Sequence, residues 1–479
     1  MCGPIPDYHQ EWGPFNQESV SHSLMIKEVH IMNNFPSEVK QTLDNIINDM
    51  ANVAWLYSTR PGHAFTRTGK LGFAKTMELV IAMEGGTLSD EIMEYFNYDL
   101  NSPTPSAFVQ QRSMLKLEAF QYLFKEFTNH YHSPKYKNGY SILAADGTKV
   151  VYATNPANVD DYVKPDKEGE RGYNHLHLNA FYDIVTGCYV DAIIQHGIRQ
   201  DEREALHTMI DNYDAPDPLH TIITVDRGYE SFDLIGHMLD KNLRFVMRVK
   251  DYTVFSSLLT NLTDSFPDRD EFDVNIKRFV TRSRSKIKQS LDPSIYLYIR
   301  PQKNFRSLPP ESNDLYYMNI RVTRIKLSDG SYECLVSNLP MSEFTAEELK
   351  DIYHARWKIE TSFRYLKYAV GMTNFHSRKL EFVKQEIFAK LTLYNFSAFI
   401  TNQASASKCK KKGNKHNYKI NFSMAAKICH RFLKNTNTSS VIDVIAWIER
   451  NLSVDKAEER HFVRNLRGIG ACSFLYRVA

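Results

Sequence analysis

The segment IYHARWKIETSFRYLK, from Ile352 to Lys367, most constrains what this chain can fold into. In a helix each residue advances roughly 100° around the axis, so one set of side chains falls in an arc about 80° wide. This polar stripe consists of Tyr353, Arg356, Glu360, Arg364 and Lys367. An apolar band of similar width runs beside it: Ile352, Ala355, Ile359, Phe363 and Leu366. The helix can therefore bury one flank and present a carboxylate between cations on the next. The alternative is an ordinary amphipathic surface helix with i,i+4 charge pairs.

A single acid interrupts the apolar, extended-looking run from Tyr140 to Val151. This acid is Asp146, and Gly147 follows it. A charge inside a strand needs a reason, because burying an unpaired carboxylate is costly. Asp-Gly is also one of the commonest hairpin dipeptides. Asp146 is therefore either a turn residue or a metal ligand on a central strand.

A second acid, Asp226, follows the short apolar strand expected over Ile222 to Val225. Ligand crevices of open α/β sheets lie at the carboxyl ends of the strands, which is where this strand delivers Asp226. Gly228 lets the backbone turn away immediately. The alternative is an aspartate that only caps the helix after the strand.

These three segments together resemble the insertion-sequence-4 family of DDE transposases. The spacing of Tyr353, Arg356, Glu360 and Lys367 resembles the Y-R-E-K signature of that family. The segment Asp226–Tyr229 (DRGY) resembles its second-aspartate box, and Asp146-Gly147-Thr148 resembles the first. The resemblance covers roughly residues 140 to 400, and three boxes in the right order arise by chance far less often than one. It implies a cut-and-paste DNA transposase acting on terminal inverted repeats.

The resemblance also implies a site. Its catalytic and metal-binding residues would be Asp146, Asp226 and Glu360, which repel one another at pH 7 unless cations lie between them. Hard oxygen ligands select two Mg²⁺ (or Mn²⁺) ions, which can assist an in-line phosphoryl displacement. The candidate DNA-binding residues are Tyr353, Arg356, Lys367, Arg227, Trp357 and Arg364. Trp357 could stack on a base, or it could pack under the domain.

The expected partner is double-stranded DNA, comprising the terminal inverted repeats and the target, with a homodimer in the DNA complex. Two other functions remain open. One is a ribonuclease H-like metal-dependent nuclease that cuts without joining. The other is a catalytically inactive DNA-binding protein derived from a transposase.

The expected fold class is α/β, with a ribonuclease H-like catalytic core interrupted by a β-rich insertion and with helical N-terminal and C-terminal domains. Strand-like runs over 272–281, 294–299, 316–326 and 332–338 separate Asp226 from Glu360 and predict the insertion. Short helices expected over 36–56, 73–84, 87–96 and 107–127 are helix-turn-helix-like. The predicted domains are as follows: 1–135, helical and DNA-binding; 136–250, the first part of the core; 251–340, the insertion; 341–404, the last core helices; and 405–479, helical.

Composition adds limits on partners and compartment. A net charge of +3 neither requires nor excludes a nucleic-acid partner, so local clusters of charge must decide. The basic stretches at 277–288 and 408–419 are either phosphate-binding segments or solvated segments. The six cysteines never approach C-x2-C spacing, which argues against a zinc ribbon and a disulfide framework. There is no apolar run of about 18 residues and no signal-peptide pattern. We therefore expect a cytoplasmic protein, associated with the nucleoid of a bacterial cell.

Overall fold

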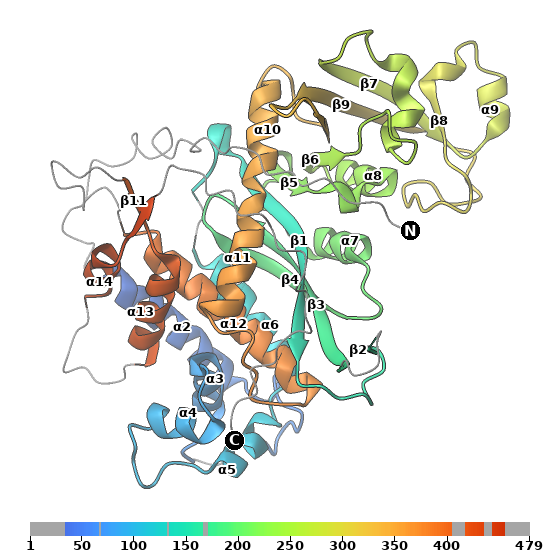
Figure 1. Ribbon diagram of the computed structural model, residues 1–479. Coiled ribbons are helices and arrows are strands. Elements are labelled where there is room, and N and C mark those ends of the chain that lie inside the picture. The colour runs from blue at the N-terminus through green and yellow to red at the C-terminus, as the bar shows by residue number, and fades with distance from the viewer. Residues whose placement is uncertain are drawn as a thin grey trace. The chain divides into compact units, whose positions relative to one another are not determined.

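The computed structural model describes residues 34–66, 69–131, 134–165, 171–404, 417–434 and 443–455 (Figure 1). The chain divides into two compact units. The first includes Lys135–Asp146 and Asp201–Ile359, and the second includes the described parts of 27–134, 147–200 and 360–479. Strand β1 (Ser141–Tyr152) and helix α11 (Trp357–Tyr368) each contribute residues to both units.

Parallel strands form the centre of the first unit. The first residues of β1 pair in parallel with β5 (Thr221–Val225), and β5 pairs in parallel with β6 (Arg244–Val249). All residues of β5 are buried, as expected for a β-branched strand in the middle of a parallel sheet. Helix α8 (Phe232–Asp240) connects β5 to β6, and α7 (Glu202–Asn212) precedes β5.

The predicted β-rich insertion is present and extends this sheet. Its strands are β7 (Phe272–Thr281), β8 (Tyr296–Tyr298), β9 (Tyr316–Lys326) and β10 (Tyr332–Ser337). The strand order in the first unit is β1-β5-β6-β10-β9-β7-β8, in which β10 pairs antiparallel with both β6 and β9. The insertion therefore shares main-chain hydrogen bonds with the core instead of forming a separate sheet.

Part of the basic stretch at 277–288 has a structural role. Arg282 is buried, and its guanidinium group donates hydrogen bonds to four loop carbonyls. The acceptors belong to Leu308, Arg300, Lys303 and Phe305. Arg278 is also buried, whereas Lys277 and Arg284 are exposed. Only the exposed members of this stretch remain candidates for phosphate contacts.

The second unit contains the predicted antiparallel hairpin of β3 (Tyr173–Asp183) and β4 (Cys188–His196). Gly187 adopts a φ of +72° in its turn, a conformation that favours glycine. Strand β3 also pairs with β1 and with β2 (Tyr162–Val163). These strands, together with the parallel β1-β5-β6 set of the first unit, confirm the ribonuclease H-like core and the α/β class.

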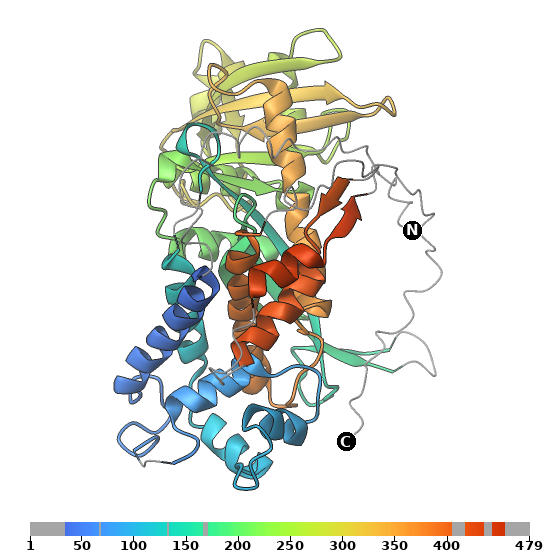
Figure 2. The same cartoon turned by 90° about the vertical axis from the view of Figure 1, so that its left-hand side faces the viewer.

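Helices from both ends of the sequence pack together in the second unit (Figure 2). The N-terminal ones are α2 (Phe35–Asn52), α3 (Phe73–Ala82), α4 (Leu88–Tyr95), α5 (Pro105–Arg112) and α6 (Leu117–Asn129). The C-terminal ones are α12 (Leu380–Thr401), α13 (Phe422–Lys434) and α14 (Val444–Arg450). Helix α12 is buried along almost its whole length, which confirms its prediction as a core helix. The division into the five predicted consecutive domains stays a prediction.

The helix predicted over 107–127 is wrong in one respect, because it is interrupted between α5 and α6. Leu115 forms an isolated β-bridge with Ser58, and Lys116 has an extended backbone. Arg112, the last residue of α5, is only 2% exposed. Its side chain bonds to Glu386 of α12, so tertiary contacts override the local helical preference.

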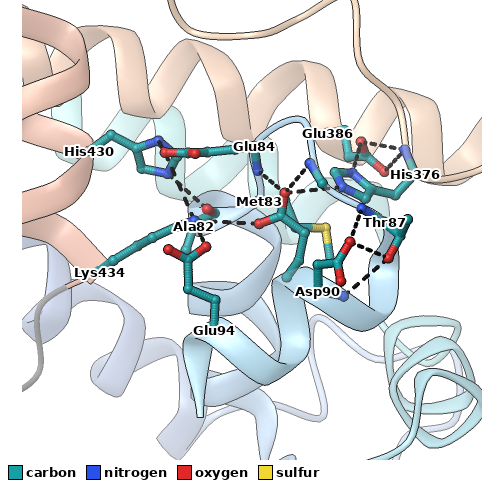
Figure 3. Close-up of polar contacts among 12 residues, drawn as sticks. Ala82, Met83, Glu84, Thr87, Asp90, Glu94, His376, Glu386, His430 and Lys434 are labelled. Atoms are coloured by element: carbon teal, nitrogen blue, oxygen red, sulfur yellow. Dashed lines mark hydrogen bonds and ion pairs between the residues drawn. The ribbon is translucent and has the colours of Figure 1, made fainter. Parts of the chain in front are cut away.

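A buried network of charges holds these helices together (Figure 3). Glu386 Oε1 accepts from Arg112 Nη1 at 2.8 Å, and its Oε2 lies 3.2 Å from His376 Nδ1. Glu91 lies 3.7 Å from His376 Nε2 and 3.4 Å from Lys434 Nζ. The network thus joins α4 and α5 to α12 and α13 through paired charges, the form in which buried charges are tolerated.

This network predicts an acid-dependent loss of stability. Burial raises the pKa of Glu386, but Arg112 and His376 together lower it to about 2. Burial likewise raises the pKa of Glu91, and His376 and Lys434 lower it to about 2. Both values lie below the ordinary 4.5, so the unfolded chain binds more protons, and the stability present above 4.5 is lost as pH falls toward 2. Urea unfolding measured across this range checks it.

The control for this prediction is Glu91→Gln, which removes one titrating carboxyl group. The wild type should exceed this variant in stability near neutral pH, and the difference should shrink as the pH falls below 4.5. A difference that stays constant with pH would contradict the assigned pKa of Glu91.

Three described cysteines, Cys188, Cys334 and Cys429, are buried and free. This agrees with the expectation that the chain builds no disulfide framework, as far as the described residues go. Within the same residues, no helix has the length and apolar character needed to cross a membrane.

Candidate active site

Two aspartates of the first unit belong to neighbouring central strands: Asp146 lies within β1, and Asp226 directly follows β5. The parallel register pairs Leu143 with Ile223 and Ala144 with Thr224. Continued by two residues, this register would set Asp146 opposite Asp226. Neighbouring strands lie about 4.8 Å apart, so the two carboxylates start from adjacent positions. The roles of Asp146 and Asp226 as metal ligands stay predictions.

The backbone after β5 fixes the Asp226 side chain. Asp226 Oδ1 accepts a hydrogen bond from the Gly228 amide at 2.8 Å and caps the short helical turn Arg227–Tyr229. A Cβ atom at Gly228 would lie 3.0 Å from that oxygen, so a larger residue there would require the carboxylate to shift by a few tenths of an ångström. Arg203 Nε donates to the Gly228 carbonyl at 2.9 Å, which ties the turn to α7. The capping role and a ligand role for Asp226 are therefore compatible, since its second oxygen is not used in the cap.

Tyr229 marks the point where the charges of the first unit gather. Its side chain is buried, and its hydroxyl makes no hydrogen bond to any residue that the structure describes. Burial, followed by the negative charges of Asp146, Glu202 and Asp226, raises the pKa of Tyr229 well above its usual range, and Arg356 opposes the shift. Sequence reasoning missed Tyr229 and Glu202 as members of this cluster, although Tyr229 lies within the DRGY box.

Arg356 lies against the first aspartate. Its Nη1 is 3.3 Å from Asp146 Oδ2, and the residue is only 6% exposed. Two guanidinium groups, those of Arg248 and Arg356, each lie 5.8 Å from the centroid of the Tyr353 ring. Tyr353 is also 6% exposed. Both residues therefore line the buried side of the site in the protein without DNA.

The predicted single helix across the polar stripe is wrong at one position. The structure has α10 (Ala346–Ala355), then a break at Arg356, then α11. The Arg356 amide bonds to Tyr353 and the Ile359 amide bonds to Arg356, so the chain tightens to i→i−3 bonds there. The predicted start is confirmed, because Thr345 and Glu348 form a reciprocal capping box.

The remaining stripe residues belong to the second unit. Lys367 Nζ donates to Thr148 Oγ1 of β1 at 2.7 Å. Glu360 is half-buried, and Arg364 is exposed. In the first unit, Trp357 is 49% exposed, which excludes the alternative in which it packs fully under the domain. Arg227 is half-buried in the turn that follows Asp226.

The donor atoms were compared with what a divalent cation requires. Across the described residues, no three His, Cys, Asp or Glu side chains are grouped closely enough to hold a metal ion. The chemistry of the acidic pair nonetheless fits Mg²⁺ or Mn²⁺, which prefer carboxylate oxygens. Asp146 and Asp226 would hold such an ion, and the cation of Arg356 now lies where it would reduce repulsion between them.

The fold and the acidic pair together define the class: a protein with a ribonuclease H-like core that carries one carboxylate within a central strand, at Asp146, and another directly after its neighbour, at Asp226. The family model described as "Transposase DDE domain" matches residues 137–396, which is more than half of the chain. The chain therefore belongs to the family of proteins with a transposase DDE domain.

Individual relatives match over shorter stretches. The putative transposases InsL of insertion sequence elements IS186A and IS186B from Escherichia coli K12 are each 33% identical over 94 residues. The transposase of insertion sequence element IS421 from Escherichia coli has the same identity over the same length. Each match covers 18% of this chain, and the chain spans a quarter of the length of these curated relatives.

A solved structure also resembles the chain. It is the piggyBac transposase synaptic complex with hairpin DNA, with a TM-score of 0.41 and 10% sequence identity. The likeness covers 83% of this chain and 80% of that one. A TM-score this low does not establish a common fold.

Proposed function

We propose that this chain is a DNA transposase of the insertion-sequence-4 family that cuts at terminal inverted repeats and joins the ends to target DNA. The observation that carries the proposal is the parallel pairing of β1 with β5, whose register, continued by two residues, would set Asp146 beside Asp226. Paired carboxylates on neighbouring strands suit metal-dependent phosphoryl transfer, and membership of the DDE domain family supports DNA as the substrate class.

Glu360 completes the acidic set in this proposal. Its place in the set comes from the resemblance of Tyr353, Arg356, Glu360 and Lys367 to the Y-R-E-K signature. Within the first unit Arg356 contacts Asp146, and within the second unit Lys367 contacts Thr148.

The reaction would use the residues as follows. Two Mg²⁺ or Mn²⁺ ions would activate the attacking oxygen and stabilise the leaving oxygen. Asp146, Asp226 and Glu360 would supply the anionic oxygens that retain them. The Tyr229 hydroxyl, buried and protonated at neutral pH, would donate a hydrogen bond to an acid or to the substrate. Arg356 would exchange Asp146 for a DNA phosphate, which an arginine can bind in a bidentate manner.

The other proposed DNA contacts follow from exposure and charge. Lys367, Arg364 and Arg227 would bind phosphates, and Trp357 would stack on a base. Tyr353 would hold Arg356 by its ring face. The N-terminal helices would bind duplex DNA, and two protomers would pair in the DNA complex.

A strand-transfer assay tests this proposal. Uncut and pre-cut inverted-repeat ends are mixed in parallel with the protein, a target plasmid and Mg²⁺, and bound, cleaved and joined DNA is resolved by electrophoresis. Joining is the expected result. Cleavage of uncut ends without any joining would instead support the nuclease, and end binding without cleavage would support the inactive DNA-binding protein.

Arg356 and Lys367 should act on DNA position and leave metal binding intact. Arg356→Gln or Lys367→Gln should lower the end-cleavage rate about a hundredfold, because a misplacement of about 1 Å can cost that much. End-cleavage rates measured against Mg²⁺ concentration check this. If excess Mg²⁺ fully restores the rate, these cations belong to the metal site and the assignment is wrong.

A further inference from the structure

The insertion presents a sheet face that the proposed active site does not use. Strands β7, β8 and β9 lie side by side (Figure 1), and their register aligns Phe279 with Tyr296 of β8 and with Tyr317 of β9. The ring of Phe279 lies 5.8 Å from that of Tyr296 and 5.6 Å from that of Tyr317, centroid to centroid. Tyr298 follows on β8 in line with Thr281. Aligned residues of neighbouring strands point to the same side, so these rings form one surface.

Around Phe279 and Tyr317 this face is accessible, whereas the opposite face is core. Along β7, Ile276, Arg278 and Val280 are buried, while Lys277 is exposed and Phe279 is half-buried. Thr281, at the end of the strand on the ring side, is buried. On β9 the same alternation buries Met318 and Ile320 and leaves Tyr317 50% exposed. An antiparallel sheet that buries one face normally puts polar residues on the other. A row of aromatic rings on the outer face therefore requires an explanation other than packing.

The charges beside the rings are positive. Lys277 pairs in register with Asn319, next to the Phe279–Tyr317 pair. The Arg284 guanidinium lies 4.9 Å from the centroid of Tyr298. Asp273, further along the same side of β7, is bonded to Arg321 and so adds no free negative charge. Rings flanked by cations complement a ligand that has flat π faces and an anionic backbone.

We propose that this face, defined by Phe279, Tyr296, Tyr298 and Tyr317, binds unpaired bases of single-stranded DNA. The rings stack on successive bases, and Lys277 and Arg284 meet the phosphates. Duplex DNA hides its π faces within the base stack and fits such a surface less well. The inference rests on the proposed function only in taking DNA as the partner, and it does not depend on the catalytic acids.

Fluorescence anisotropy tests this by measuring the affinity of the full-length protein for a labelled oligothymidine of about 15 nucleotides, in the absence of metal. An inverted-repeat duplex is titrated in parallel. Tyr317→Ala should weaken single-strand binding about tenfold, and Tyr317→Trp should restore it, because stacking needs only a ring. Lys277→Gln should lower the slope of log affinity against log salt by about 0.7. The matched control is Trp447→Ala on α14, since Trp447 is 48% exposed and also has an arginine, Arg450, beside its ring.

Unchanged single-strand binding in Tyr317→Ala would overturn the inference. So would an equal loss of duplex binding, or an equal loss in Trp447→Ala. The proposed function fails separately: if the wild type binds the oligothymidine through Tyr317 yet never cleaves inverted-repeat ends with Mg²⁺, the surface stands and the transposase assignment does not.

Discussion

Asp146→Asn, Asp226→Asn and Glu360→Gln should each slow end cleavage by at least about a thousandfold, since metal ions supply several kcal/mol of transition-state stabilisation. Each substitution keeps the size of the side chain and removes one anionic oxygen. Binding of inverted-repeat DNA should remain within a few-fold of wild type, because phosphate and base contacts set affinity. Cleavage of labelled ends and gel-shift affinity, measured on the same preparations, check both parts.

The matched control for these variants is Glu202→Gln. Glu202 contributes to the negative charge around Tyr229, but it is not one of the proposed metal ligands. Its cleavage rate should fall far less than that of the three acid variants. Cleavage within tenfold of wild type by any one of the three variants would remove that acid from the site.

Arg112→Met should destabilise the protein by about 3–5 kcal/mol, the usual cost of breaking a buried ion pair from one side. Glu386 is 1% exposed and would lose its bond from Arg112 while remaining charged. Replacing both residues, as Arg112→Met with Glu386→Gln, should recover much of the loss, because no uncompensated charge remains. Urea unfolding followed by circular dichroism gives the free energies.

An exposed pair provides the comparison for this prediction. Arg431 lies 3.4 Å from Glu94 and its side chain is 76% exposed, so Arg431→Met should cost less than about 1 kcal/mol. If Arg112→Met were no more destabilising than Arg431→Met, the buried network would not hold α5 to α12.

Regular periodicity made much of the fold predictable. β7 and β9 have the bounds expected from their apolar patterns, since strands of period two leave few alternatives. Asp226 could be placed because it follows a short apolar strand, and Asp146 because it interrupts one. Their shared level could not be predicted, since register depends on the pairing of strands far apart in sequence.

Tertiary contacts explain the failures. The break at Arg356 accompanies burial of its guanidinium against Asp146, and the interruption after Arg112 accompanies its bond to Glu386. In both cases the arginine is buried against a carboxylate that lies far away in the sequence. Hydrophobic periodicity carries no information about such pairs. The predicted basic run at 408–419 lies mostly outside the described residues, as does the helix predicted from Glu458.

In the proposed function, Asp146, Asp226 and Glu360 together hold the catalytic ions. Crystals of the protein with inverted-repeat DNA, soaked in Mn²⁺ and measured at a wavelength where manganese scatters anomalously, would locate these ions. Anomalous peaks are expected between the three carboxylates, and they should be lost in Asp226→Asn. Peaks elsewhere, or none at saturating Mn²⁺ with ordered DNA ends beside these acids, would show that the three residues do not hold the ions.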